Sequence, residues 1–206
     1  MKRCVIVGGA DINNYDRINQ YLRPDDFGIF CDRGQLHLPF LRLSPKLFIG
    51  DFDSSPRPDT EAETIVLPRM KDDTDSFFAG KEALRRGFED FLLIGIAGGR
   101  LDHTLGNLSL LLYLDSLGKH ALALDDYSEM EIVSRQRAEI PDSFSYFSLL
   151  NISGLARGIT IIGAKYPLTD AEITCDYAYG ISNEVLPGET AHVSLREGRL
   201  LLLKIF

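Results

Sequence analysis

The chain has 206 residues, 45% of them hydrophobic and 10% aromatic, which is enough apolar material for one large or two small folded domains. Its 22 basic and 30 acidic residues give a net charge of −8, and without a lysine or arginine cluster we expect no nucleic-acid partner. The three cysteines lack metal-ligand spacing and no apolar run approaches the ~20 residues of a membrane span, so we expect a cytoplasmic protein without a membrane partner.

Short apolar runs alternate with helical periodicity over the first two thirds of the chain. Segments 76–86 and 104–117 are predicted helices, and in the second of them Leu105, Leu108, Leu112 and the neighbouring leucines form a broad stripe that we expect to pack on a sheet. Strands that alternate with helices pair in parallel, which predicts a layered α/β domain. The predicted strands are residues 4–7, 28–31, 47–49, 64–67, 91–96 and 121–124.

The last third of the chain has a different character. Residues 137–143 include Pro141 and are predicted to be a connection, beyond which we find no helical periodicity. Gly198 supplies the positive φ of a hairpin turn between the last two β-prone stretches. We therefore predict an α/β domain with a mainly parallel sheet over 1–136 and an antiparallel β-sandwich over 137–206. The β-prone stretches are residues 146–152, 158–162, 173–175, 191–195 and 200–206.

Aspartates follow the predicted strands of the first domain. Asp51 and Asp53 come directly after the strand at 47–49, and on an extended segment their spacing points both carboxylates the same way. Asp32, Asp73 and Asp102 also follow strands. Because ligands gather at the carboxyl ends of parallel strands, we expect these side chains to converge. Converging carboxylates repel one another unless a divalent cation such as Mg²⁺ lies between them.

A glycine-rich segment adds a second signal for phosphate. Gly98 and Gly99 allow backbone N–H groups to approach an anion before a predicted helix, and Arg100 offers a planar fork to phosphate oxygens. Lys71 precedes another aspartate group. No Walker A sequence or Gly-x-Ser-x-Gly motif is present, and the scattered histidines argue against a zinc hydrolase. The residues alone thus indicate an α/β enzyme that handles a magnesium-bound phosphate ester or anhydride.

Each motif also has a purely structural explanation. Asp72 or Asp73 would cap a helix that starts near Thr74, and Asp102 would cap the next one. Residues 51–54 would form a turn after a strand. If these motifs lie together at one edge of the sheet, a functional site is favoured over separate caps and turns.

The motifs occur in a specific order. They are Gly-Asp-Phe-Asp-Ser at 50–54, Lys-Asp-Asp-Thr-Asp at 71–75, Gly-Gly-Arg-Leu-Asp-His at 98–103 with Asn107 one turn on, and segments 163–168 and 180–184. Together they resemble the thiamine pyrophosphokinase family over nearly the whole chain. The resemblance implies transfer of pyrophosphate from ATP to thiamine, giving thiamine diphosphate and AMP. It also implies Mg²⁺, a catalytic α/β domain, a thiamine-binding and dimerising β-sandwich, and a homodimer with shared active sites.

The resemblance also implies roles for individual residues. The carboxylates expected around Mg²⁺ are those of Asp51, Asp53, Asp73 and Asp75. The residues expected to bind the nucleotide and its phosphates are Asp32, Ser54, Thr74, Gly98, Gly99, Arg100 and His103. The catalytic set comprises the candidate proton acceptors and the cations that stabilise charge, namely Asp73, Asp102, Lys71 and Arg100.

Ser182 and Asn183 are expected to bind thiamine from the partner subunit, although by themselves they fit a hairpin turn. Two departures from the family pattern stand out. Arg33 follows Asp32 where the family usually has paired small residues, so it would either alter nucleotide contacts or point to solvent. The chain has no tryptophan to stack on thiamine, and Tyr177 or Tyr179 would offer an aromatic face to its cationic ring.

Other classes of protein fit parts of the pattern. An apolar strand that ends in Asp-x-Asp also suits a metal-dependent glycosyltransferase acting on a nucleotide sugar. A thiamine- or nucleotide-binding module without catalysis is the third alternative. Carboxylates that converge on one edge are costly to assemble unless chemistry or a metal uses them, which favours an enzyme over the binding module.

Overall fold

The computed structural model describes residues 2–53, 55–68, 70, 72–152 and 154–206. The chain divides into two compact units, Met1–Asp126 and Tyr127–Phe206. The predicted boundary after residue 136 falls inside the second unit. Strand β7 (Ser128–Val133) pairs with β13 (Leu200–Ile205), so the segment before that boundary belongs with the C-terminal strands.

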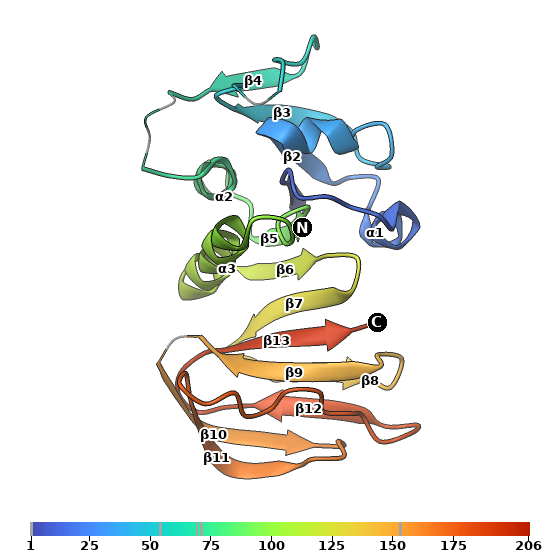
Figure 1. Ribbon diagram of the computed structural model, residues 1–206, viewed down its shortest axis with the longest axis vertical. Coiled ribbons are helices and arrows are strands. Elements are labelled where there is room, and N and C mark those ends of the chain that lie inside the picture. The colour runs from blue at the N-terminus through green and yellow to red at the C-terminus, as the bar shows by residue number, and fades with distance from the viewer. Residues whose placement is uncertain (1, 54, 69, 71, 153) are drawn as a thin grey trace. The chain divides into compact units, whose positions relative to one another are not determined.

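A parallel sheet forms the first unit (Figure 1). Its strands follow the order β4-β3-β2-β1-β5-β6, and each neighbouring pair is parallel, which confirms the predicted pairing. Strands are added on one side of β1 up to β4 and then on its other side, so a topological switch point lies between β1 and β5. The strands are Arg3–Val7 (β1), Phe27–Cys31 (β2), Pro45–Gly50 (β3), Glu63–Val66 (β4), Asp90–Ile94 (β5) and His120–Leu124 (β6).

Helices cover the sheet. The predicted α2 (Asp75–Arg85) and α3 (Leu101–Ser116) are present, whereas α1 (Tyr15–Tyr21) and the 3₁₀ turn η1 (Asp32–His37) were not predicted because they are too short for a clear periodicity. In the described part of the chain, no helix is long and apolar enough to cross a membrane.

The buried face of α3 is narrower than the predicted leucine stripe. Leu105 is 55% exposed, and Leu108 and Leu112 are only partly buried. The fully buried leucines are Leu110, Leu111 and Leu114. The helix is leucine-rich on nearly all sides, so its periodicity does not select one face and packing against α2 and the sheet decides it.

Helices α2 and α3 lie side by side (Figure 1), and their contact is tight. A Cβ added to Gly80 would lie 2.6 Å from a methyl carbon of the fully buried Leu110. The rings of Phe77 and Tyr113 have centroids 5.1 Å apart. These apolar contacts fix the two helices relative to each other.

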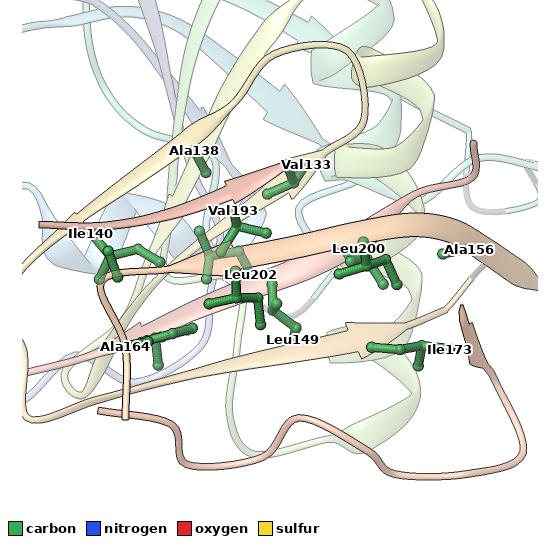
Figure 2. Close-up of a cluster of buried hydrophobic side chains, with 14 residues drawn as sticks. Val133, Ala138, Ile140, Leu149, Ala156, Ala164, Ile173, Val193, Leu200 and Leu202 are labelled. Carbon is green, nitrogen blue, oxygen red and sulfur yellow. The ribbon is translucent and has the colours of Figure 1, made fainter. Parts of the chain in front are cut away.

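The second unit consists of antiparallel strands. Strands β7, β13 and β9 (Tyr146–Asn151) form one set, in which β13 is central. The other set has the order β11-β10-β12-β8. Side chains from both sets form one buried cluster, in which Leu202 of β13 and Val193 of β12 take part (Figure 2). The strands of the second set are Ala138–Pro141 (β8), Leu155–Ile162 (β10), Leu168–Thr174 (β11) and Thr190–Ser194 (β12).

Two predictions for this unit were wrong. The expected connection at 137–143 contains strand β8, whose Pro141 lies opposite Thr190 at the end of an outer strand, where a missing N–H is tolerated. The expected hairpin between β12 and β13 is not formed, because β12 pairs with β10 and β8 whereas β13 pairs with β7 and β9. Gly198 has the anticipated positive φ of 92°, but its turn connects two different sheets.

Glu82 of α2 is buried and bound by two arginines. Its carboxylate accepts hydrogen bonds from Arg85 and Arg86, each at 2.7 Å, and Arg86 also reaches Glu63 of β4. The hydrogen bond from Arg85 is the largest cause that lowers the pKa of Glu82, from 4.5 to about 2, against the opposing effect of burial.

We expect the Glu82 contribution to stability to be present above about pH 4.5 and lost as pH falls towards 2, because the unfolded state binds the proton more readily. In Glu82→Gln, the free energy of unfolding measured by urea denaturation should therefore fall less steeply as the pH is lowered. The exposed Glu61→Gln is the control. An unchanged pH dependence in Glu82→Gln would show that other groups determine it.

Candidate active site

A cavity of about 760 Å³ lies at the carboxyl ends of the strands in the first unit. The loops after β1, β2, β3 and β5 and the first turns of α2 and α3 form its walls. This confirms that the predicted motifs meet at one edge of the sheet. The predicted site residues that line the cavity are Asp32, Asp51, Asp53, Asp73, Thr74, Asp75, Gly98, Gly99, Arg100 and His103.

Other predicted site residues lie elsewhere. Ser54 and Lys71 fall outside the described residues. Asp102 is not among the residues that line the cavity, although its neighbours Arg100 and His103 are. Its side chain instead accepts the His103 N–H at 3.0 Å and binds Arg100.

The capping explanation does not account for these aspartates. Thr74 is the N-cap of α2, and its hydroxyl accepts the Phe77 N–H at 3.3 Å. The N-cap position of α3 is Arg100, with no side-chain cap, and Asp102 is already inside the helix. Asp73 therefore does not cap α2, and Asp102 is not the N-cap of α3, although its carboxylate accepts the first-turn N–H of His103.

The loop after β3 is not extended, contrary to the prediction. Phe52 has a φ of 55°, in the left-handed region, yet both Asp51 and Asp53 line the cavity. Asp32 has a φ of 41° and accepts a hydrogen bond from the Ser55 hydroxyl at 3.1 Å. Each such non-glycine conformation costs about 1–3 kcal/mol, and this kind of strain is concentrated at functional sites.

Two ion pairs involve the predicted catalytic residues. Arg100 donates two hydrogen bonds to Asp102, at 3.1 and 2.5 Å, and this pairing is the first cause that lowers the pKa of Asp102. Lys81 of α2 donates to both carboxylate oxygens of Asp73, at 2.8 and 3.0 Å. Both pairs are exposed, where an ion pair contributes little to stability, so a substrate or cation can replace it at low cost.

The glycine segment after β5 has the conformation that its composition predicts. Gly98 and Gly99 have φ values of 110° and 64°, which side chains other than glycine rarely adopt. The Gly98 N–H is already bound to the Thr104 hydroxyl at 3.1 Å. The hydrogen bond to Thr104 therefore holds the glycine turn in place next to Arg100.

Residues of the first loop that line the cavity, among them Ala10 and Asp11, were not predicted. The His37 ring donates through Nε2 to the Ala10 carbonyl at 3.1 Å and accepts the Tyr15 hydroxyl at Nδ1, 2.8 Å away. Burial is the main cause that lowers the pKa of His37, which favours the neutral ring. Gly8-Gly9 after the first strand was the available signal for this loop.

Arg33 also lines the cavity and is exposed, so its departure from the family pattern concerns the site itself. Gly9 makes room for it, since a Cβ at that glycine would lie 2.7 Å from the Arg33 Cβ.

Among the described residues, no group of three or more histidine, cysteine or acidic side chains is arranged to hold a metal ion. Asp51, Asp53, Asp73 and Asp75 nevertheless all line the same cavity. Magnesium is usually held by one or two carboxylates and completed by water and phosphate oxygens. The oxygen-only donor set fits a cation that arrives with a phosphate ligand.

Ser182 and Asn183 lie in the second unit and differ in their surroundings. Ser182 is exposed, with a φ of 56°, and its N–H binds the Ser148 hydroxyl. The buried Asn183 amide binds the backbone N–H and carbonyl of Tyr166 at 3.0 and 2.9 Å, so it builds this loop. The exposed rings of Tyr177 and Tyr179 are stacked, with centroids 6.0 Å apart.

Comparison with known proteins identifies the family. Residues 18–122 match the thiamin pyrophosphokinase catalytic domain, and residues 129–200 match the thiamin pyrophosphokinase vitamin B1 binding domain. The chain belongs to the thiamine pyrophosphokinase family. This confirms the resemblance of the motifs.

Individual members of the family agree over the full length. The thiamine pyrophosphokinase of Bacillus subtilis (strain 168) is 27% identical over 212 residues, covering 99% of both chains. A thiamin pyrophosphokinase structure from Geobacillus thermodenitrificans is 26% identical with a TM-score of 0.83, covering 100% of this chain and 98% of that one. A family protein from Enterococcus faecalis is also 26% identical, with a TM-score of 0.82 and 99% of both chains covered.

Proposed function

We propose that this enzyme transfers the pyrophosphoryl group of ATP to the hydroxyl of thiamine with the help of Mg²⁺, forming thiamine diphosphate and AMP. The observation that best supports the proposal is the cavity at the topological switch point, which gathers the acidic and glycine-arginine motifs of the family. A nucleotide bound in this position fits the general rule for open α/β sheets.

In this proposal Asp51, Asp53, Asp73 and Asp75 hold Mg²⁺ together with the phosphates. When bound, the cation neutralises phosphate charge and orients the triphosphate. The strained backbone at Phe52 presets the loop that carries the first two of these carboxylates.

The thiamine hydroxyl attacks the β-phosphorus of ATP, and the bond from that phosphorus to the oxygen bridging to the α-phosphorus breaks, so AMP leaves. Asp73 accepts the hydroxyl proton in our proposal, because it lines the cavity and Asp102 does not. Asp102 instead orients the Arg100 guanidinium, and that pairing lowers the pKa of the carboxyl. Arg100 and Lys71 stabilise the charge of the transferred group.

We place thiamine against the second unit of the partner subunit in a homodimer that functions in the cytoplasm. Ser182 would contact the aminopyrimidine of thiamine. Asn183 shapes the loop, and its own contact with thiamine stays a prediction. The stacked Tyr177 and Tyr179 offer an aromatic face to the cationic thiazolium ring in place of tryptophan.

The proposal is tested by AMP release from ATP by the purified protein, with and without thiamine. We expect AMP and thiamine diphosphate in equal amounts, and none once EDTA has removed the divalent cation. UDP-sugar turnover without AMP would favour a glycosyltransferase. Thiamine or ATP binding without AMP under any divalent cation would favour a binding module, and either result would refute the proposal.

A further inference from the structure

A chain of side-chain hydrogen bonds crosses the floor of the cavity from α2 to the loop after β5. The Ser76 hydroxyl donates to the Asn107 Oδ1 at 2.5 Å, and the Asn107 Nδ2 donates to the Ile96 carbonyl at 2.7 Å. The Ser76 proton is thereby used, so the Thr74 hydroxyl, 3.2 Å away, donates to the Ser76 oxygen. Every member has a defined direction, and hydrogen bonds arranged head to tail strengthen one another.

The bridge connects the two motifs that handle phosphate and metal. At one end, Thr74 and Ser76 lie next to Asp73 and Asp75, and at the other end Ile96 leads into the glycine segment. An asparagine amide suits this position because it accepts from one motif and donates to the other. Its orientation is fixed, since only the Nδ2 side can face a carbonyl oxygen.

The polar bridge is not what holds the helices together. Below it, Gly80 packs against Leu110 and Phe77 packs against Tyr113, as described above. Ser76 is buried and Asn107 is partly buried, so losing the amide affects the first turns at the cavity rather than the apolar contact beneath.

We propose that Asn107 is a positioning residue that keeps the Asp73–Asp75 segment and the glycine segment after β5 in mutual register for catalysis. The proposal rests on the proposed function and adds a residue that need not touch substrate. Misplacement of catalytic groups by about 1 Å can cost about 10²-fold in rate, so a bridge of this kind has a measurable effect on turnover.

The test uses Asn107→Ala, Ser76→Ala and their combination, with Ser109→Ala as control. Ser109 is exposed on the same helix, and among the described residues its hydroxyl donates only to Leu105 O. We expect Asn107→Ala to lower kcat roughly 30-fold and Ser76→Ala roughly tenfold, with KM for thiamine within about twofold. The double variant should be no slower than Asn107→Ala, because both changes break one bridge. Ser76→Thr, which keeps the hydroxyl, should restore most of the loss.

Hydrogen exchange of the folded protein gives a readout that does not depend on turnover. Asn107→Ala should accelerate amide exchange in both 74–77 and 96–100, whereas Ser109→Ala should change neither segment. Full kcat in Asn107→Ala, losses that multiply in the double variant, or faster exchange in one segment only would overturn the proposal. If the unmodified protein released no AMP, the proposed function would fail while the exchange result still decided whether the bridge couples the two segments.

Discussion

Replacing Arg100 by alanine is expected to lower kcat about 10³-fold, the low end of the range for an arginine that stabilises a transferring phosphoryl group. Arg100 lines the cavity and its guanidinium is oriented by two hydrogen bonds to Asp102. Arg100→Lys should recover only part of the activity, since lysine keeps the charge but not the planar fork. The measurement is the steady-state rate of AMP release at saturating ATP and thiamine.

Arg23→Ala provides the matched control for this experiment. Arg23 is also an exposed arginine in an ion pair, with Asp90, but it lies outside the cavity. Its removal should leave kcat within about twofold, as is usual for surface substitutions. An Arg100→Ala enzyme that kept more than about a tenth of the original kcat would remove Arg100 from the catalytic group.

Asp73→Asn is expected to lower kcat about 10³-fold, a loss typical of a general base, and to weaken ATP binding by a smaller factor because the other three carboxylates still hold Mg²⁺. Asp102→Asn should cost only about tenfold, because its proposed task is to orient Arg100 rather than to accept the proton. Single-turnover rates and ATP affinity measured by calorimetry separate chemistry from binding.

Lys81→Met controls for the loss of the Asp73 ion pair, because it leaves the carboxylate in place. That variant should keep kcat within about twofold, as an exposed pair contributes little. Equal loss of ATP binding in Asp73→Asn and Asp102→Asn would argue against a base in either position. A larger loss of kcat in Asp102→Asn would transfer the role to Asp102.

Sequence patterns predicted the first unit well because the causes are local. Short apolar runs form buried strands, and the rule for parallel sheets then brings Asp51, Asp73 and Arg100 to one edge without knowledge of long-range contacts. The position of Asp102 was harder to predict, because successive helical residues point in different directions. Arg100 and His103 line the cavity, whereas the Asp102 side chain binds Arg100.

The remaining errors involve pairing between distant segments. A turn at Gly198 looks the same whether its strands pair with each other or enter different sheets, so the supposed hairpin could not be recognised. The Asn107 bridge depends on Ser76 from another helix, and the buried Asn183 amide depends on Tyr166 from another loop. No local periodicity encodes such contacts.

Strand β13 lies between β7 and β9 although it comes later in the chain than either of them. During synthesis on the ribosome, the edges of β7 and β9 that pair with β13 stay unpaired until β13 has been made. Unpaired strand edges favour aggregation. The parallel sheet of the first unit, in contrast, uses only strands made before β7. We therefore expect the antiparallel unit to be the part of the nascent chain that is exposed to aggregation for longest.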